Sequence, residues 1–341
     1  MLKFFEKAFD RTVFFIQDLF RLDWKASDRF FYYTMKETGM KSTGLWMDIM
    51  TAVYMYQVSI LEYYHYRFFD LDYQERDNWL GKGQIRMFEK KNAQAKILSK
   101  KKKLALAERF PTLPRHRVFQ LSELQELQPM DFPECLGQGK KLLFKPQKTT
   151  RERGCMVRFS KDFSGLDMLD YMHLSGFKSV EVWLEQPEAL VKVSAFGLHR
   201  VQVLTRFDAN EGLGIVACRW LIPLNQWGES RDLDFLVAPV TADSGKVSGP
   251  AVSMDITLGD CAWHPWTGAD IEGFEFPDWE AVIGLVKRAA AESENASFWT
   301  WELVFTKEGP LLYRAEASID ALVWQLPVKQ GLKAKFQEWV K

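Results

Sequence analysis

Two acidic side chains near a tight turn mark the stretch of this sequence best suited to chemistry. Residues 301–316 read WELVFTKEGPLLYRAE, with Glu302 in the first apolar segment and Glu316 at the end of the second. The intervening residues 307–310 (KEGP) predict a turn, so the two segments are expected to pair as neighbouring strands. Mg²⁺ is usually bound by one or two carboxylates together with phosphate oxygens. Glu302 and Glu316 are therefore candidate metal ligands.

A rigid turn lies just upstream of these strands. Residues 263–279 carry His-Pro-x-Thr-Gly and then a Pro-x-Trp turn that opens a helix. His264 either serves a binding site or simply caps its own turn, and the sequence leaves both open. Asp278, directly before Trp279, is the expected helix N-cap.

Composition limits the classes of protein that these residues can belong to. The 341 residues include 45 basic and 45 acidic side chains, and 47% are apolar, so a sizeable core is expected and wholesale disorder is excluded. A balanced charge argues against nucleic acid as a partner. The four cysteines form no C-x-x-C pair, which argues against structural zinc and a disulfide framework. No apolar run of about 18 residues and no secretory signal is found, so a cytoplasmic location is expected.

The chain divides into two parts with different patterns of predicted secondary structure, and these elements must position the candidate residues. Residues 1–110 are expected to form a helical module, with helices over 25–36, 45–69 and 84–110. Residues 1–24 have an amphipathic pattern. Their apolar face packs on the body of the protein or a partner, or lies on the inner face of a membrane. From Arg117 onward, short strands alternate with helices, which predicts an α+β fold.

A basic hairpin opens this second part of the chain. The strand Lys141–Pro146 is followed by the loop QKTTRERG and a returning strand over residues 155–159. Its tip carries Lys148, Arg151 and Arg153, and residues 180–185 (VEVWLE) form a further predicted strand. Strands are also predicted at 201–206, 214–221 and 235–240, and a helix at 279–292.

The order of these motifs resembles the ATP-grasp fold. It is similar in particular to the sugar-transfer-associated ATP-grasp family, which is related to α-L-glutamate ligases. The resemblance covers roughly residues 61–325, and its most specific piece is HPWTG followed by FPDW. It implies a two-lobed nucleotide-binding fold after the N-terminal helices, with domains at 1–110, 111–190 and 191–341. It also implies ATP and Mg²⁺ as cofactors, and a carboxylate substrate that is phosphorylated to an acylphosphate before an amine or thiol attacks it.

Carried over position by position, the resemblance also implies roles for particular residues. Lys145 contacts the α- and β-phosphates, and Lys101 is the upstream phosphate lysine. Glu185 and Gln186 lie at the adenine hinge, and Glu302 and Glu316 bind metal. The loop cations Lys148, Arg151 and Arg153 cover the phosphates, while His264 and Arg314 act at the reacting end.

The sequence departs from the family pattern at the phosphate and metal motifs. The phosphate-covering loop has one glycine where bare backbone is expected. Gln202 stands where the family has an arginine, and Arg314 stands where it has a metal-binding acid. A period of two keeps Arg314 and Glu316 on one face of their strand.

Two hypotheses follow from this mixture. The first is an active ATP-dependent ligase, placed by the resemblance in a polysaccharide or sugar-modification pathway. The second is a catalytically degenerate relative that serves as a binding or scaffold subunit. Arg314 separates them, because a working enzyme should present it to phosphate and a degenerate one should pair it with Glu302 or Glu316.

Overall fold

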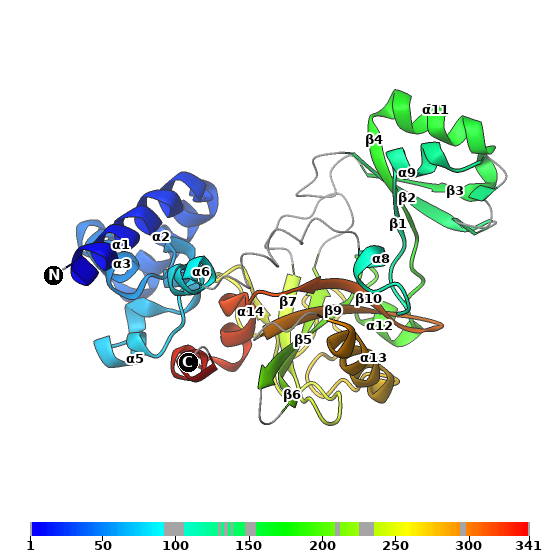
Figure 1. Cartoon of the computed structure of the whole chain (residues 1–341). Helices are drawn as coiled ribbons and strands as arrows, with labels where there is room; N and C mark the ends of the chain where they lie inside the picture. The colour runs from blue at the N-terminus through cyan, green and yellow to red at the C-terminus, as the bar shows by residue number, and fades with distance from the viewer. Residues whose placement is uncertain are drawn as a thin grey trace.

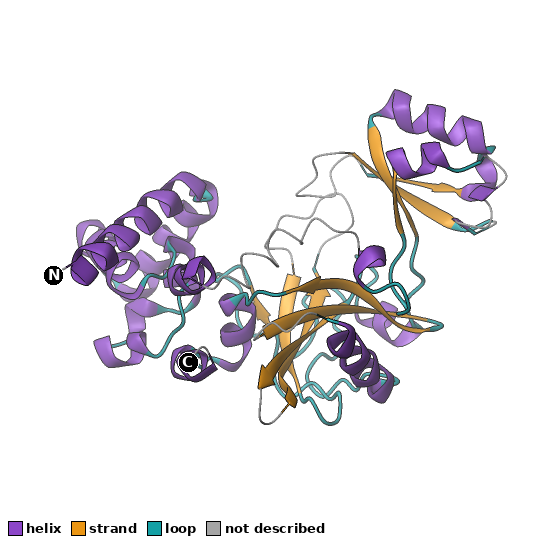
Figure 2. Ribbon diagram, viewed as in Figure 1, coloured by secondary structure: helices purple, strands orange, loops and turns teal. Residues whose placement is uncertain are grey.

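Helices and two antiparallel sheets make up this protein in the computed structural model, which describes residues 2–91, 106–128, 131–132, 136–137, 139–146, 155–208, 212–224, 235–293 and 298–339. N-terminal helices lie at one end, a large sheet in the middle, and a small sheet with its own helices at the other end (Figures 1 and 2). The predicted mixture of helices and sheets is confirmed.

The described α-helices are α1 (Leu2–Arg21), α2 (Trp24–Thr38), α3 (Ser42–Tyr56), α4 (Ile60–His65), α5 (Tyr73–Asp77), α6 (Lys82–Lys91), α8 (Leu106–Arg109), α9 (Leu121–Glu126), α11 (Gly165–Ser175), α12 (Glu188–Val193), α13 (Trp279–Glu292), α14 (Ala321–Gln325) and α15 (Lys333–Trp339). The described strands are β1 (Val118–Gln120), β2 (Lys141–Pro146), β3 (Met156–Phe159), β4 (Phe177–Val182), β5 (Arg200–Asp208), β6 (Gly212–Pro223), β7 (Phe235–Val240), β8 (Val252–Ser253), β9 (Phe298–Thr306) and β10 (Gly309–Glu316).

The predicted long helix over residues 45–69 is wrong, because the chain breaks between α3 and α4. Gln57 adopts a left-handed conformation that ends α3. Ser59 then caps α4, since its hydroxyl accepts from the Glu62 N–H while the Glu62 carboxylate accepts from the Ser59 N–H. The apolar periodicity continues across the break, so the pattern alone did not reveal it.

A buried glutamine ties the N-terminal helices to the rest of the protein. The Gln325 side chain, fully buried, accepts from the Leu80 N–H at 2.9 Å and donates to the Tyr66 hydroxyl at 2.9 Å. Because an unpaired buried amide would be costly, this pairing fixes α14 against the segment that follows α5.

The six-stranded sheet separates an apolar face from a partly polar one. Its strand order is β10-β9-β5-β6-β7-β8. Val203, Trp301 and Leu303 are buried with residues of α13, such as Val282 and Val286, on one face. Strand side chains alternate between faces, so the intervening positions 200, 202 and 302 turn to the opposite side.

The four-stranded sheet has a core of its own and the order β1-β4-β2-β3. Leu142, Phe144 and Val180 pack with residues of α9 and α11. The strand expected over 180–185 ends at Val182, so Glu185 lies in the connection that follows β4. Asp278 makes no side-chain cap bond, contrary to expectation, because it adopts a left-handed conformation.

Within the described residues, no helix combines the length and apolar character needed to cross a membrane.

Candidate functional site

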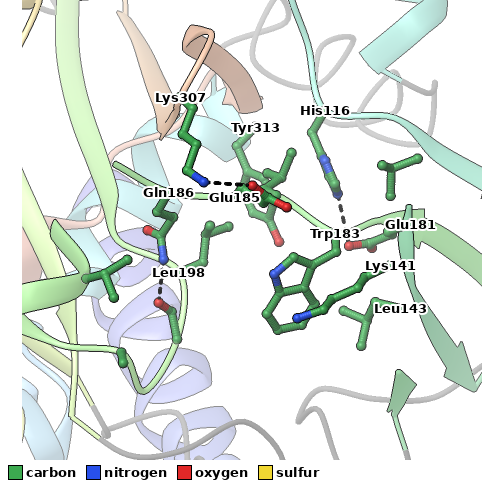
Figure 3. A pocket seen from close by; sticks show the side chains of 15 residues that line it. His116, Lys141, Leu143, Glu181, Trp183, Glu185, Gln186, Leu198, Lys307 and Tyr313 are labelled. Atoms are coloured by element: carbon green, nitrogen blue, oxygen red, sulfur yellow. Dashed lines mark hydrogen bonds and ion pairs between the residues drawn. The ribbon is translucent and has the colours of Figure 1, made fainter. Parts of the chain in front are cut away.

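A cavity of about 440 Å³ lies where the four-stranded sheet meets the six-stranded one (Figure 3). Its volume is in the usual range for small-molecule sites. The connection after β4 forms one wall, and β10 contributes Tyr313. The residues that line it are His116, Lys141, Leu143, Glu181, Val182, Trp183, Leu184, Glu185, Gln186, Val191, Ala195, Gly197, Leu198, Lys307 and Tyr313.

An acid with two basic partners stands on the cavity side of the small sheet. Leu143 of β2 pairs directly with Glu181 of β4, so Lys145, two residues further along β2, shares the face of Glu181. The Lys145 Nζ lies 2.8 Å from Glu181 Oε1, and His116 Nε2 lies 3.0 Å from Glu181 Oε2. Burial alone would raise the pKa of Glu181, but the His116 hydrogen bond and the Lys145 charge outweigh it and hold that pKa below its usual value.

His116 adds a polar atom with no protein partner in the described part of the chain. Its Nδ1 is buried and has no hydrogen bond there. Its ring stacks on Tyr313, with centroids 5.3 Å apart and planes inclined by 29°. The two rings and Glu181 therefore form one continuous side of the cavity (Figure 3).

A β-bulge explains how β10 supplies both an aromatic ring and a polar face. Leu312 pairs with Leu303, and the next paired residue, Arg314, faces Glu302, so Tyr313 is one extra residue without a partner position on β9. Such bulges re-aim side chains. Arg314 and Glu316 then share a face, as the period of two predicted.

Glu302 is held by neighbours on the adjoining strand. Only 2% of it is exposed. Arg200 Nη1 lies 3.1 Å from Glu302 Oε1, and Gln202 Nε2 donates to Glu302 Oε2 at 2.8 Å. Burial would raise its pKa, but the charges of Arg200 and Arg314 lower it below the usual value. The sequence pointed to a metal cation or Arg314 as the compensating charge, whereas Arg200 is the cation in direct contact with Glu302.

This donor set does not fit a magnesium ion. Both Glu302 oxygens are engaged, and Arg314 faces Glu302 across the ladder. Among the described residues, no group of three or more His, Cys, Asp or Glu side chains is placed to hold a metal ion. The roles of Glu302 and Glu316 as metal ligands therefore stay predictions from the sequence.

Glu185 and Gln186 both line the cavity but are engaged differently. The Glu185 carbonyl accepts from the Lys307 N–H at 3.1 Å, and its exposed carboxylate pairs with Lys307 Nζ at 2.9 Å. The Gln186 amide donates to the Gly197 carbonyl and accepts from the His199 N–H. Gln186 therefore holds the backbone just before β5 in place. Glu185 joins the connection after β4 to Lys307 in the turn between β9 and β10.

His264 is built into its own turn. It is fully buried, and its Nε2 lies 3.1 Å from the Pro223 carbonyl oxygen. Its Nδ1 accepts from the N–H groups of Trp266 and Thr267, both at 3.3 Å. Burial lowers the pKa of His264. Because both ring nitrogens serve the backbone, the geometry favours the turn-capping alternative over a catalytic role.

Four predicted phosphate-binding residues cannot be placed. Lys101, Lys148, Arg151 and Arg153 lie outside the described residues.

The residues that sequence reasoning missed are His116, Glu181, Tyr313 and Arg200. Charged residues at 181, 200 and 302 interrupt strands that are otherwise apolar on alternate positions. That alternation was the available signal for Glu181 and Arg200. Nothing local marks Tyr313, because a bulge depends on pairing with another strand.

Comparison with known proteins gives only loose similarities. No protein-family model and no curated protein matches the chain. Among solved structures, D-alanyl-alanine synthetase A from Vibrio cholerae is 12% identical with a TM-score of 0.39, covering 76% of this chain and 66% of that one. The ADP complex of N5-carboxyaminoimidazole synthetase from Staphylococcus aureus is 8% identical with a TM-score of 0.38, covering 71% and 52%.

The biotin carboxylase domain of Hydrogenobacter thermophilus 2-oxoglutarate carboxylase is 12% identical with a TM-score of 0.37, covering 72% and 50%. The chain thus spans about half to two thirds of the length of these three proteins. Because each TM-score lies below 0.5, we base the function on the residues of this chain.

Proposed function

We propose that this chain binds ATP in the cavity between its two sheets and acts as an ATP-dependent ligase of the ATP-grasp type. The observation that carries the proposal is the joint position of Lys145 and the β4 connection. The half-buried Lys145 of the small sheet pairs with Glu181, which lines the cavity, and the opposite wall includes apolar side chains and the backbone of Leu184. That combination suits a flat base at one end and phosphate at the other.

The wall of the cavity offers the groups that a purine needs. Val182, Leu184 and Leu198 supply apolar surface. Within the described part of the chain, the N–H and C=O of Leu184 have no protein hydrogen bond. A backbone donor and acceptor beside apolar side chains can bind the edge of an adenine ring while its faces are covered.

Lys145 and its neighbours would then neutralise charge on the phosphates. In the proposed reaction, a substrate carboxylate oxygen bonds to the γ-phosphorus and ADP leaves. An amine or thiol next attacks the acyl carbon, and phosphate leaves. The protein contributes position and positive charge in such transfers. A sugar-linked acid as substrate remains an expectation from the sequence resemblance.

A second candidate, a nucleotide-binding subunit without turnover, is favoured by one observation. Glu302, where the resemblance places a metal carboxylate, is already paired with Arg200. Both candidates require ATP binding, and they differ in whether ADP is released.

Calorimetric titration with ATP tests the shared requirement. The change is Lys145→Met, and Lys178→Met on the same sheet is the control, because Lys178 is an exposed cation of β4. Loss of one charge-assisted phosphate bond should weaken ATP binding roughly tenfold or more in the first variant only. ADP release in the presence of mixed amino acids and sugar acids supports the ligase, and binding without release supports the subunit. Absence of ATP binding by the wild type would reject both.

A further inference from the structure

On the polar face of the six-stranded sheet, the Glu302 carboxylate is paired with a basic side chain of the protein itself. Glu302 of β9 lies between Gln202 on β5 and Arg314 on β10. Arg200 and Gln202 each engage one of its oxygens. A magnesium ion binds through carboxylate oxygens, so it would compete with the Arg200 and Gln202 contacts to use Glu302.

Both arginines of this polar face reach solvent. Arg200 is 28% exposed although its partner Glu302 is almost fully buried. Arg314 is exposed and follows Tyr313, which lines the cavity. Burial raises the pKa of Tyr313, the nearby charges of Lys145 and Arg200 oppose that rise, and those of Glu181 and Glu302 add to it. Lys145 of the small sheet and Arg200 of the large sheet therefore both lie near Tyr313.

A glutamine in place of an expected arginine fits the same arrangement. Gln202 stands where the resembled family has an arginine. Arg200 lies two residues earlier on the same face of β5, so a guanidinium is present one pleat away.

We propose that the guanidinium groups of Arg200 and Arg314 take the place of a divalent cation, so that the cavity binds the free nucleoside polyphosphate in preference to its magnesium complex. This inference rests on the proposed function, since it concerns the same ligand. Guanidinium groups bind phosphate oxygens through paired, charge-assisted hydrogen bonds. A bound magnesium ion cancels two of the ligand's negative charges and occupies the oxygens that these groups would contact.

The test compares ATP binding by calorimetry in EDTA and in excess MgCl₂. We expect the wild type to bind ATP in EDTA at least about threefold more tightly than in MgCl₂, because free ATP presents two more negative charges to the cations than its magnesium complex does. Arg314→Gln should weaken binding in EDTA by roughly tenfold. The control Arg288→Gln removes an exposed arginine of α13, which packs on the opposite face of the sheet, and should leave both affinities unchanged.

A reversal variant sharpens the comparison. Arg314→Glu adds a carboxylate opposite Glu302 and two residues from Glu316 on β10. The variant should bind ATP weakly in EDTA and recover affinity in MgCl₂ or MnCl₂. Because Arg314 is exposed, neither substitution at this position should prevent folding, which circular dichroism checks directly.

The outcomes separate this inference from the proposed function. Wild-type binding that is equally tight or tighter in MgCl₂ than in EDTA would overturn the inference and leave ATP binding intact. Equal affinities of Arg314→Gln and Arg288→Gln in EDTA would also overturn it. Absence of binding in both buffers would instead reject the proposed function.

Discussion

At the scale of single residues, the site is organised by two carboxylates that each pair with basic side chains of the protein. Glu181 bridges Lys145 and His116 on the small sheet. Glu302 is bonded to Arg200 and lies opposite Arg314 on the large one. Buried carboxylates need such partners, because burying a charge without compensation is costly. The same cations that stabilise these acids are the groups available to phosphate.

The Arg200–Glu302 pair gives a prediction about stability. Arg200→Leu leaves the buried Glu302 carboxylate with the Gln202 amide in direct contact and Arg314 across the ladder, and it should lower the free energy of unfolding by about 2–3 kcal/mol. The double variant Arg200→Leu with Glu302→Leu removes both charges and should recover at least half of that loss. Urea denaturation of the wild type, both single variants and the double variant measures the coupling. Additive effects would show that the pair does not act as a unit.

His199 gives a prediction about pH. Its Nε2 lies 2.8 Å from the Ser194 carbonyl oxygen, and its Nδ1 accepts from the Trp220 indole N–H at 3.2 Å. Burial lowers its pKa from 6.5 to about 4. Between these values the unfolded chain binds a proton that the folded protein does not, so folding free energy is lost as pH falls.

From pH 7.5 to 5.0, His199 should account for a loss of about 2 kcal/mol. Urea unfolding at both pH values, compared between the wild type and His199→Gln, isolates this part. The variant should lose less stability on acidification than the wild type. An equal loss in the two proteins would mean that His199 is not held neutral by the fold.

At the scale of elements, the bulge in β10 has a clear consequence. Tyr313 is an extra residue, and without it Leu312, Arg314 and Ala315 would pair regularly with Leu303, Glu302 and Trp301. Core residues would stay in the core and polar ones on the polar face. The bulge therefore serves the cavity, where Tyr313 supports His116, and is not needed to keep the strand in register.

Deletion of Tyr313 should consequently be tolerated by the fold. We expect a loss of about 1–2 kcal/mol in the free energy of unfolding, from the missing ring and its stack, together with weaker ATP binding. Deletion of Leu303, which pairs with Val201 in the regular β5–β9 ladder, is the matched control and should prevent folding, because it shifts the side chains of β9 to the other face relative to β5. If both deletions unfold the protein, the bulge has a structural role.

The elements themselves were largely predictable from sequence, and their contacts were not. The bounds of β2, β7 and α13 were predicted as observed, since apolar alternation and helical spacing are local signals. The break at Gln57 was missed because a left-handed residue leaves the apolar pattern unchanged. The partners of Glu302 and Glu181 depend on strand register, which one sequence does not reveal. The resemblance assigned Lys145, Glu185 and Gln186 to a nucleotide site, and of these Glu185 and Gln186 line the cavity while Lys145 pairs with Glu181 beside it.

At the scale of the whole molecule, the small sheet is a unit with its own core joined to the large sheet by few connections. Its apolar core includes Leu124, Phe144 and Met172. The Leu312 N–H donates to the Pro114 carbonyl and the His116 N–H donates to the Leu312 carbonyl, so the chain entering β1 is bonded to β10. The connection after β4 is joined to Lys307 in the same way. Such a unit can open locally, and a ligand between the sheets should oppose that opening.

Hydrogen exchange with and without ATP tests this arrangement in the intact protein. A ligand at 100 times its dissociation constant stabilises the bound state by about 2.7 kcal/mol. Exchange of amides in β2, β4 and residues 183–186 should therefore slow by up to roughly a hundredfold. Amides of α2 and α3 serve as the internal control, because they pack in a separate apolar cluster and should not change. Protection confined to the N-terminal helices would place the nucleotide elsewhere, and equal protection throughout would show that the two sheets and the helices unfold as one unit.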